Sequence, residues 1–253
     1  MIWNGRVASE AERRGTFEAN GRFIASGTVG VIAIQLDYAK LPGNVVNPAT
    51  YDFPVIFKRV EFEIERLFTG DPTLVDVVVD AARELESQGA SVIVGACGFF
   101  AHFQDAVADA VSVPVYLSSL TQLSMIKLGL KRDQKVLVFA ADGSSITDEM
   151  LAHVGATKDG VIVQNVGDRP AFEPIRYGVK PLDNGALIDD MCELARAQCE
   201  AHPEIGAVLL ECSDLPPYAA DVQRACRRPV FDFITLINWA HQAVAQRPYY
   251  GWL

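Results

Sequence analysis

Two cysteine residues occupy matching positions after short apolar stretches of the sequence. Cys97 follows residues 92–94 in the segment SVIVGACGFFAHFQ, and Cys212 follows residues 207–210 in AVLLECSDLP. Each pattern predicts a buried strand with a cysteine at its end, followed by a turn or a helix. Two thiols that face each other can remove a proton from one side of a carbon atom and return one from the other side. The pair therefore indicates proton transfer at a carbon next to a carboxylate.

A thiol at a junction between a strand and a helix faces unpaired backbone N–H groups. These groups and the helix dipole favour thiolate, so we expect the pKa of Cys97 to lie below its ordinary value of about 8.5. The alternative is that Cys97 is only a small buried apolar residue, as free cysteines often are. A second cysteine in the same local pattern favours the chemical interpretation.

The spacing of similar segments indicates an internal repeat. Cys212 follows Cys97 by 115 residues, and the segment RPVF at 228–231 follows VPVY at 113–116 by the same interval. Upstream, GVIAIQLDY at 30–38 is answered by KVLVFAADG at 135–143. The chain is therefore predicted to consist of two related halves.

Strands that alternate with helices predict an α/β fold with mostly parallel sheets covered by helices. We expect two pseudo-symmetric lobes with the active site in the cleft between them. The predicted strands are 29–36, 92–94, 113–117, 136–141, 161–166, 207–211 and 230–233. The predicted helices include 72–88, 120–130, 183–201, 218–226 and a last helix that ends at 245. The predicted units are an N-terminal arm of residues 1–26, a first lobe of residues 27–130 and 234–253, and a second lobe of residues 131–233.

Composition excludes several functional classes. The 253 residues carry a net charge of −10 and no basic patch, which argues against a nucleic-acid partner or an anionic membrane surface. Because no apolar run reaches the roughly 20 residues of a membrane span, and residues 1–15 lack a signal-peptide core, we expect a cytoplasmic protein. Five cysteines without metal-finger spacing, four scattered histidines, and the absence of GxGxxG after the first strand predict neither metal nor cofactor.

Further candidate residues lie at the ends of the predicted strands, where α/β folds place ligand-binding groups. Asp37 and Tyr38 are expected to orient the substrate or a thiol, although Asp37, like Asp142, is also typical of a turn. Residues 47–54 are expected to form a lid. Backbone N–H groups and hydroxyls at strand ends are expected to bind the substrate carboxylate and the charge that develops on it. These candidates are Gly98, Phe99, Ser118, Ser119, Gly143, Ser144 and Ser213.

The paired GACG and LLECS segments, each after a strand, resemble the aspartate/glutamate racemase superfamily, from about residue 27 to residue 241. This resemblance implies that Cys97 and Cys212 are the acid/base pair of a cofactor-independent enzyme. Amino-acid racemases of this group usually have Cys-Asn-Thr and Cys-Thr-His, whereas this chain has CGF at 97–99 and CSD at 212–214. The difference puts recognition of an amino acid's ammonium group in doubt. Phe99 and Phe100 suggest an aromatic face for an apolar or cationic group instead.

The segments GVIAIQLDYAKLPGN, GACGFFAHFQ and VPVYLSSLTQL are also similar to the Alma-type dimethylsulfoniopropionate lyases of that superfamily. Three activities remain open at this point: a racemase or epimerase as the first expectation, a dimethylsulfoniopropionate lyase as the second, and a one-cysteine decarboxylase as a third. A protein that binds a small carboxylate without turnover is the alternative outside enzymes. The resemblance implies a small carboxylate as the partner and a homo-oligomer, a dimer or a tetramer.

Overall fold

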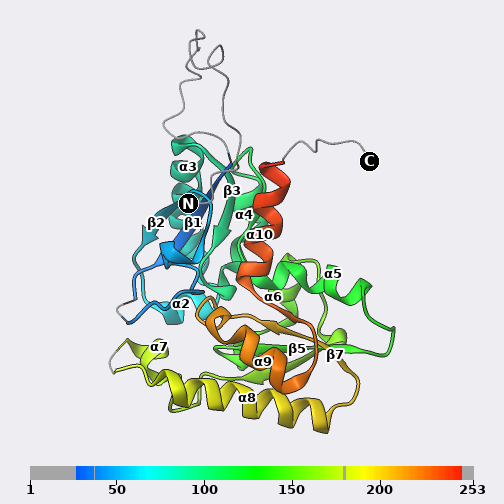
Figure 1. The fold of residues 1–253 in the computed structure, drawn as a ribbon. Helices are drawn as coiled ribbons and strands as arrows, with labels where there is room; N and C mark the ends of the chain where they lie inside the picture. Colours follow the sequence, from blue (N-terminus) through cyan, green and yellow to red (C-terminus); the bar gives the residue numbers. More distant parts are fainter. Residues whose placement is uncertain (1–26, 37, 179–180, 247–253) are drawn as a thin grey trace, which may run out of the picture.

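Two parallel sheets of four strands each form the framework of the chain (Figure 1). The computed structural model describes residues 27–36, 38–178 and 181–246. The first sheet contains β1 (Thr28–Ile34), β2 (Val55–Val60), β3 (Ala90–Gly95) and β4 (Val115–Tyr116). The second contains β5 (Lys135–Ala140), β6 (Val161–Asn165), β7 (Ile205–Leu210) and β8 (Val230–Phe231).

The two sheets repeat one topology. Their strand orders are β2-β1-β3-β4 and β6-β5-β7-β8, so the first strand of each half lies between the second and the third. Each sheet also has a register shift at the start of its first strand, between Thr28 and Val29 in one and between Lys135 and Val136 in the other. The two related halves that the sequence predicts are confirmed by this shared order and shared irregularity.

Helices connect the strands and cover the sheets, as an all-parallel arrangement requires. The α-helices are α2 (Ile64–Phe68), α3 (Val75–Gln88), α4 (Gln104–Ala108), α5 (Leu123–Leu128), α6 (Asp148–His153), α7 (Glu173–Tyr177), α8 (Asn184–Ala201), α9 (Ala219–Cys226) and α10 (Phe233–Val244). Short 3-10 helices occupy Pro48–Thr50, Pro72–Leu74, Gly98–Phe103, Ser119–Gln122, Gly143–Ser145, Lys158–Gly160 and Pro216–Tyr218.

The central strands are buried on both faces because helices cover them from two sides. All residues of β1 and all residues of β7 are buried, which explains their continuous apolar sequences. The helix α3 packs on the first sheet through one apolar stripe and ends at Gly89, whose φ of 105° provides a left-handed cap. Burial of these apolar surfaces is the main force that holds each sheet against its helices.

The last helix returns to the first sheet. Phe233 and Ile237 of α10 share a buried cluster with Val31 of β1 and Val92 of β3. At its start, Asp232 and Thr235 form a reciprocal capping box. The predicted arm of residues 1–26 lies outside the described residues, and the predicted lobe boundaries stay a prediction.

The structure corrects several predicted elements. The strand expected at 113–117 is only Val115–Tyr116, and the helix expected at 120–130 is a 3-10 turn followed by Leu123–Leu128. The edge strand β2 and the short helices α2 and α7 were not predicted. β2 has no simple apolar period because it pairs only with β1 and is mostly half-buried or exposed. Helices of five residues are too short to give a helical pattern in a sequence.

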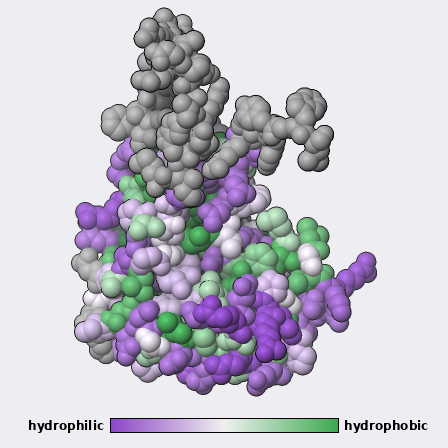
Figure 2. All heavy atoms as spheres, in the orientation of Figure 1, coloured by the Kyte–Doolittle hydropathy of each residue, from purple (hydrophilic) through white to green (hydrophobic). Residues whose placement is uncertain are grey.

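Hydrophilic side chains cover the face of the molecule over α8 and α9, whereas exposed apolar side chains gather around α5 (Figure 2). On α5, Met125 is 51% exposed and Leu128 is 87% exposed. Within the described ranges, the helices are too short or too polar for any of them to span a bilayer.

Leu85 of α3 is fully buried, and its side chain packs directly on Gly30 of β1. We expect Leu85→Ala to lower the free energy of unfolding by about 2–5 kcal/mol because it leaves a cavity between α3 and the first sheet. Leu128→Ala is a matched control on an exposed helical position, with an expected change of about 0.5 kcal/mol or less. Urea denaturation of both variants measures the difference. Equal losses would contradict the packing described here.

Candidate active site

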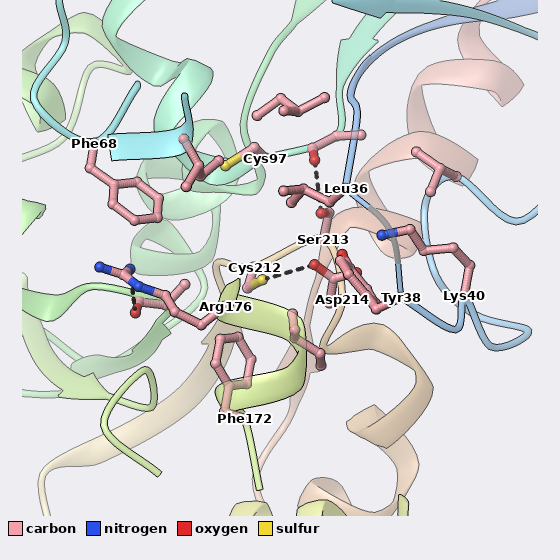
Figure 3. Close-up of a pocket in the computed structure, with 16 residues that line it drawn as sticks. Leu36, Tyr38, Lys40, Phe68, Cys97, Phe172, Arg176, Cys212, Ser213 and Asp214 are labelled. Atoms are coloured by element: carbon pink, nitrogen blue, oxygen red, sulfur yellow. Dashed lines mark hydrogen bonds between the residues drawn. The ribbon is translucent and has the colours of Figure 1, made fainter. Parts of the chain in front are cut away.

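The ends of β3 and β7 bring Cys97 and Cys212 into one pocket between the two sheets (Figure 3). Ala96 separates Cys97 from the end of β3, and Glu211 separates Cys212 from the end of β7. Parallel strands expose their carboxyl ends at one edge of a sheet, and here the two edges face each other. The cleft between the lobes that the sequence predicts is confirmed in this arrangement.

The pocket is lined mostly by apolar side chains. It contains about 540 Å³ of space not filled by atoms, with the solvent at its open mouth included. The polar and charged groups converge from both halves of the chain. The apolar part of the lining consists of Ile34, Leu36, Val46, Ile64, Phe68, Phe172 and Ile175.

Both cysteines are held as neutral thiols. Burial raises the pKa of Cys97 well above its ordinary value, the Glu211 carboxyl raises it further, and the Phe99 N–H group only partly offsets this. Burial likewise raises the pKa of Cys212, with Asp214 and Glu211 adding to the effect. The predicted lowering of the Cys97 pKa is therefore wrong. A six-residue 3-10 helix follows Cys97, and its few N–H groups do not compensate for loss of water around the thiolate.

Asp214 forms the anionic end of the pocket. Its Oδ1 atom accepts a hydrogen bond of 2.5 Å from the Tyr38 hydroxyl and another from the side-chain amide of Asn44. Its Oδ2 atom lies 3.5 Å from the Cys212 sulfur, which donates to it. The ammonium of Lys40 lies 2.9 Å from the centre of the Tyr38 ring. The segment after β1 is thus joined to the turn after β7.

Arg176 of α7 provides a cation at the other end of the pocket (Figure 3). Its guanidinium carbon lies 4.3 Å from the centre of the Phe68 ring, which belongs to the opposite half of the chain. One guanidinium nitrogen donates to the Ala141 carbonyl at 3.3 Å, and the other lies 3.6 Å from the Asp142 carboxylate. The aromatic ring, the carbonyl and the carboxylate hold this cation beside the thiols.

Glu211 lies behind the two cysteines and is fully buried. The Ala141 N–H group donates to its Oε2 atom at 3.1 Å, whereas Oε1 has no hydrogen-bond partner within the described part of the chain. Burial raises the pKa of Glu211 to about 8, and the nearby Asp142 and Asp214 add to the increase. A Cβ atom at Gly98 would come within 1.9 Å of Oε1, so only glycine fits beside this carboxyl group.

The structure places some predicted binding residues at the pocket and others elsewhere. Tyr38 and Ser213 line it, with the Ser213 hydroxyl donating to the Ala96 carbonyl at 2.8 Å. Gly98 and Phe99 are buried directly after Cys97, and the Phe99 N–H group bonds the Cys97 sulfur. Asp37 lies outside the described residues.

The remaining predicted residues make structural contacts. Ser118 is buried and caps the following 3-10 turn, and the Ser119 hydroxyl donates to backbone carbonyls at the end of β7. Ser144 is exposed and bonds Asp142, while the Gly143 N–H group bonds the Asn165 side chain. These side chains therefore have partners within their own turns or in the sheet framework.

The predicted aromatic and lid residues also differ from expectation. Phe99 and Phe100 are fully buried in the core, and Phe68 and Phe172 provide the aromatic lining instead. In the expected lid, Phe53 stacks on His241 of α10 at 3.8 Å between ring centres. The residues that line the pocket lie earlier in the same loop, at Leu36, Tyr38, Lys40 and Val46.

Besides Lys40, three charged residues of the site were not among the predicted site residues. Glu211 gave a weak signal, because it is a charged residue between an apolar strand and Cys212. Asp214 stood out only as a departure from the racemase pattern. Arg176 gave no signal, since its five-residue helix has no distinct pattern and only folding brings it to Phe68.

Among the residues that the structure describes, no cluster of three or more His, Cys, Asp and Glu side chains is arranged to hold a metal ion. The expectation of a reaction without metal or cofactor stays a prediction.

The chain is similar in sequence to several dimethylsulfoniopropionate lyases, although no protein-family model matches it. The dimethylsulfoniopropionate lyase of Durusdinium sp. clade D is 30% identical over 254 residues, which cover 97% of this chain and 84% of that protein. Dimethylsulfoniopropionate lyase 3 of Emiliania huxleyi (strain CCMP1516) is 30% identical over 236 residues, which cover 88% of this chain and 61% of the relative.

The fold is shared with solved structures of racemases and a decarboxylase. Allantoin racemase from Pseudomonas fluorescens superimposes with a TM-score of 0.58 at 13% identity, over 85% of this chain and 89% of that one. Unliganded arylmalonate decarboxylase superimposes with a TM-score of 0.53 at 21% identity, over 87% of this chain and 93% of that one. At these identities the likeness establishes the two-lobed α/β fold.

The pKa of Glu211 makes the stability of the fold depend on pH. The folded chain keeps this proton up to about pH 8, whereas the unfolded chain releases it near the ordinary value of 4.5, so stability falls as the pH rises between these values. Glu211→Gln removes this dependence. We expect the variant to gain stability relative to the wild type from pH 5 to pH 8, as measured by urea denaturation, with the exposed Glu200→Gln as control. A constant difference across this range would show that Glu211 is ionised throughout.

Proposed function

This chain belongs to the family of the dimethylsulfoniopropionate lyases, and from that premise we propose that it cleaves dimethylsulfoniopropionate to dimethyl sulfide and acrylate. Membership of this family, within the aspartate/glutamate racemase superfamily, makes the chain an enzyme, either a lyase or an isomerase. The observation that carries the choice of substrate is the arrangement of charge in the pocket. Arg176 lies at one end, Asp214 lies at the other, and the two cysteines lie between them (Figure 3).

The two ends of the pocket complement a zwitterion. Dimethylsulfoniopropionate carries a carboxylate at one end of a short chain and a positive sulfonium at the other. The Arg176 guanidinium matches the substrate carboxylate, since two N–H groups of a guanidinium can donate in one plane to the two oxygens of a carboxylate. Asp214 and the Tyr38 ring favour a cation, as the Lys40 ammonium over that ring illustrates. The apolar lining accommodates the methyl groups.

The proposed base is Cys212, because its thiol already donates to a carboxylate. Asp214 accepts this hydrogen bond at 3.5 Å and provides a site for the proton. A sulfonium close to the thiol lowers the pKa of the thiol by Coulomb attraction, so the substrate itself offsets the increase caused by burial. The positive charge of Arg176 slightly lowers the pKa of Cys97, against the larger effect of burial. Cys97 is the second thiol of the pocket and is not the proposed base.

The reaction balances without another reactant. The Cys212 thiolate takes the proton from the carbon next to the carboxylate, and the electrons of that C–H bond form the double bond of acrylate. The C–S bond breaks at the adjacent carbon, and its electron pair leaves on sulfur as neutral dimethyl sulfide. The carboxylate holds negative charge as the proton leaves, and the Arg176 guanidinium stabilises that charge in a pocket with little water.

A racemase or epimerase is the second candidate, because two thiols from opposite strand ends share one pocket. Such an enzyme uses both cysteines equally, one to remove a proton and one to return it. A binding protein without turnover would use neither. In all three cases the proposed partner is a small carboxylate, and a homo-oligomer of two or four copies stays a prediction.

Cysteine variants test the proposed roles. We expect Cys212→Ser to lower kcat for release of dimethyl sulfide by about 10²- to 10⁴-fold, because a hydroxyl is a far weaker acid than a thiol. We expect Cys97→Ser to cause a smaller loss, and Cys192→Ser on the distant helix α8 to cause none. Headspace gas chromatography with purified protein gives these rates. Equal losses at Cys97 and Cys212 would show that both thiols act in the elimination and contradict the assignment of Cys212 alone as the base. Unchanged rates would exclude the assigned roles.

The carboxylate site is tested by replacing Arg176. Loss of a hydrogen bond to a charged group costs about 1.5–3 kcal/mol, so Arg176→Met is expected to raise KM for dimethylsulfoniopropionate roughly 10- to 150-fold. Arg169→Met is the matched control, since Arg169 precedes the same helix but pairs at 3.9 Å with Glu193 of α8. An unchanged KM in Arg176→Met would place the substrate carboxylate elsewhere in the pocket.

A further inference from the structure

A second pair of cysteines lies outside the pocket, between two helices of the second half. Cys199 is in the last turn of α8, and Cys226 is the final residue of α9. The two helices pack along each other, Cys226 belongs to the buried core cluster, and Cys199 packs against that cluster. Cys199 is half-buried and Cys226 is buried with 8% of its surface exposed. Nothing in the proposed reaction uses this pair.

The backbone after Cys226 directs donors toward its sulfur. Arg227 has a φ of 53° and forms a left-handed cap of α9. Within the described residues, all other positive φ values belong to glycines. This turn brings the N–H group of Arg228 onto the Cys226 sulfur. The Nε atom of Arg228 donates to the Ile205 carbonyl at 2.8 Å, which fixes the guanidinium nearby. The sulfur of Cys226 thus has a thiol donor, a backbone donor and a cation around it.

These contacts divide the proton between the two sulfurs unequally. The hydrogen bond from Cys199 is the main cause that lowers the pKa of Cys226 to about 6, against the opposing effect of burial. The same hydrogen bond raises the pKa of Cys199, since this thiol is the donor. By contrast, burial raises the pKa of both Cys97 and Cys212. Thiolate is the form that peroxides oxidise, so Cys226 is the more reactive position.

The pair is remote from the catalytic pocket. Arg228 contacts Ile205 at the start of β7, whereas Cys212 follows the end of that strand. A strand of six residues spans about 20 Å. A bond formed between Cys199 and Cys226 therefore joins α8 to α9 at the edge of the sheet opposite to the pocket.

We propose that Cys199 and Cys226 are a peroxide-responsive dithiol site, which closes to a reversible disulfide while the two pocket cysteines stay reduced. The Cys226 thiolate attacks one oxygen of hydrogen peroxide, so an S–O bond forms, the O–O bond breaks and hydroxide leaves. The Cys199 sulfur then attacks the Cys226 sulfur, the S–O bond breaks, and its proton leaves with the hydroxyl as water. Two thiols and one peroxide thus give one disulfide and two waters, and a thiol reductant reverses the change.

The test uses the reduced full-length protein and does not depend on the reaction proposed above. The protein is treated with increasing hydrogen peroxide, free thiols are blocked with N-ethylmaleimide, and peptides are analysed by mass spectrometry without reduction. Trypsin alone leaves Cys199 and Cys212 in one peptide, so a glutamate-specific protease is added to cleave at Glu200 and Glu204. We expect a peptide with Cys199 linked to Cys226 at peroxide levels that leave Cys97 and Cys212 blocked by maleimide.

Variants identify the order of events. Cys199→Ser is expected to stop the reaction at a Cys226 sulfenic acid, which dimedone traps, and Cys226→Ser is expected to leave Cys199 unoxidised. Cys192→Ser, on the same helix and without a thiol partner, is the matched control and is expected to form the disulfide as the wild type does. Oxidation of Cys97 or Cys212 before Cys226 in the wild type would overturn the proposal, as would a disulfide that includes Cys192.

Discussion

The cost of burying charge is the constraint on which the site depends. Cys212, Asp214 and Glu211 are each less than a tenth exposed, and Cys97 lines the same pocket. An isolated ionised group in such surroundings is strongly disfavoured. The structure resolves this in two ways. Glu211 and both cysteines keep their protons, while Asp214 accepts hydrogen bonds from Tyr38, Asn44 and Cys212. The pocket is thus ready for a ligand that brings its own pair of charges.

The convergence of two sheets places these groups together. In each half the third strand lies between the first and the fourth, and both cysteines follow third strands, at the carboxyl ends of the two parallel sheets. The contacts then cross between the halves. Arg176 reaches Phe68, Tyr38 reaches Asp214, and the Glu211 carboxyl reaches Gly98. The contacts that hold the two halves together are therefore also the contacts that close the pocket. A substrate that binds both Arg176 and Asp214 would add a further link between the halves.

Local and repeated signals in the sequence were enough to predict the buried central strands and the cysteine pair. The apolar runs of β1, β3, β5 and β7 are continuous because those strands are buried on both faces, and the repeat of 115 residues placed Cys97 and Cys212 at equivalent ends. The charge state of the thiols could not be predicted in this way. It depends on burial and on carboxyl groups that reach the cysteines only in the folded chain. Arg176 was missed for the same reason. Of the predicted serines, Ser213 lines the pocket, whereas the Ser119 hydroxyl bonds a backbone carbonyl and the Ser144 hydroxyl bonds the Asp142 carboxylate.

The most direct test of the central claim follows the fate of the proton that the cysteines remove. Purified protein is mixed with dimethylsulfoniopropionate in deuterated water, and proton NMR follows the substrate and acrylate while the headspace is sampled for dimethyl sulfide. The account predicts acrylate and dimethyl sulfide in equal amounts. Deuterium that enters the carbon next to the carboxylate without release of dimethyl sulfide would contradict the lyase and indicate proton exchange alone. An unchanged substrate would contradict both the assigned substrate and the fit between its charges and the pocket.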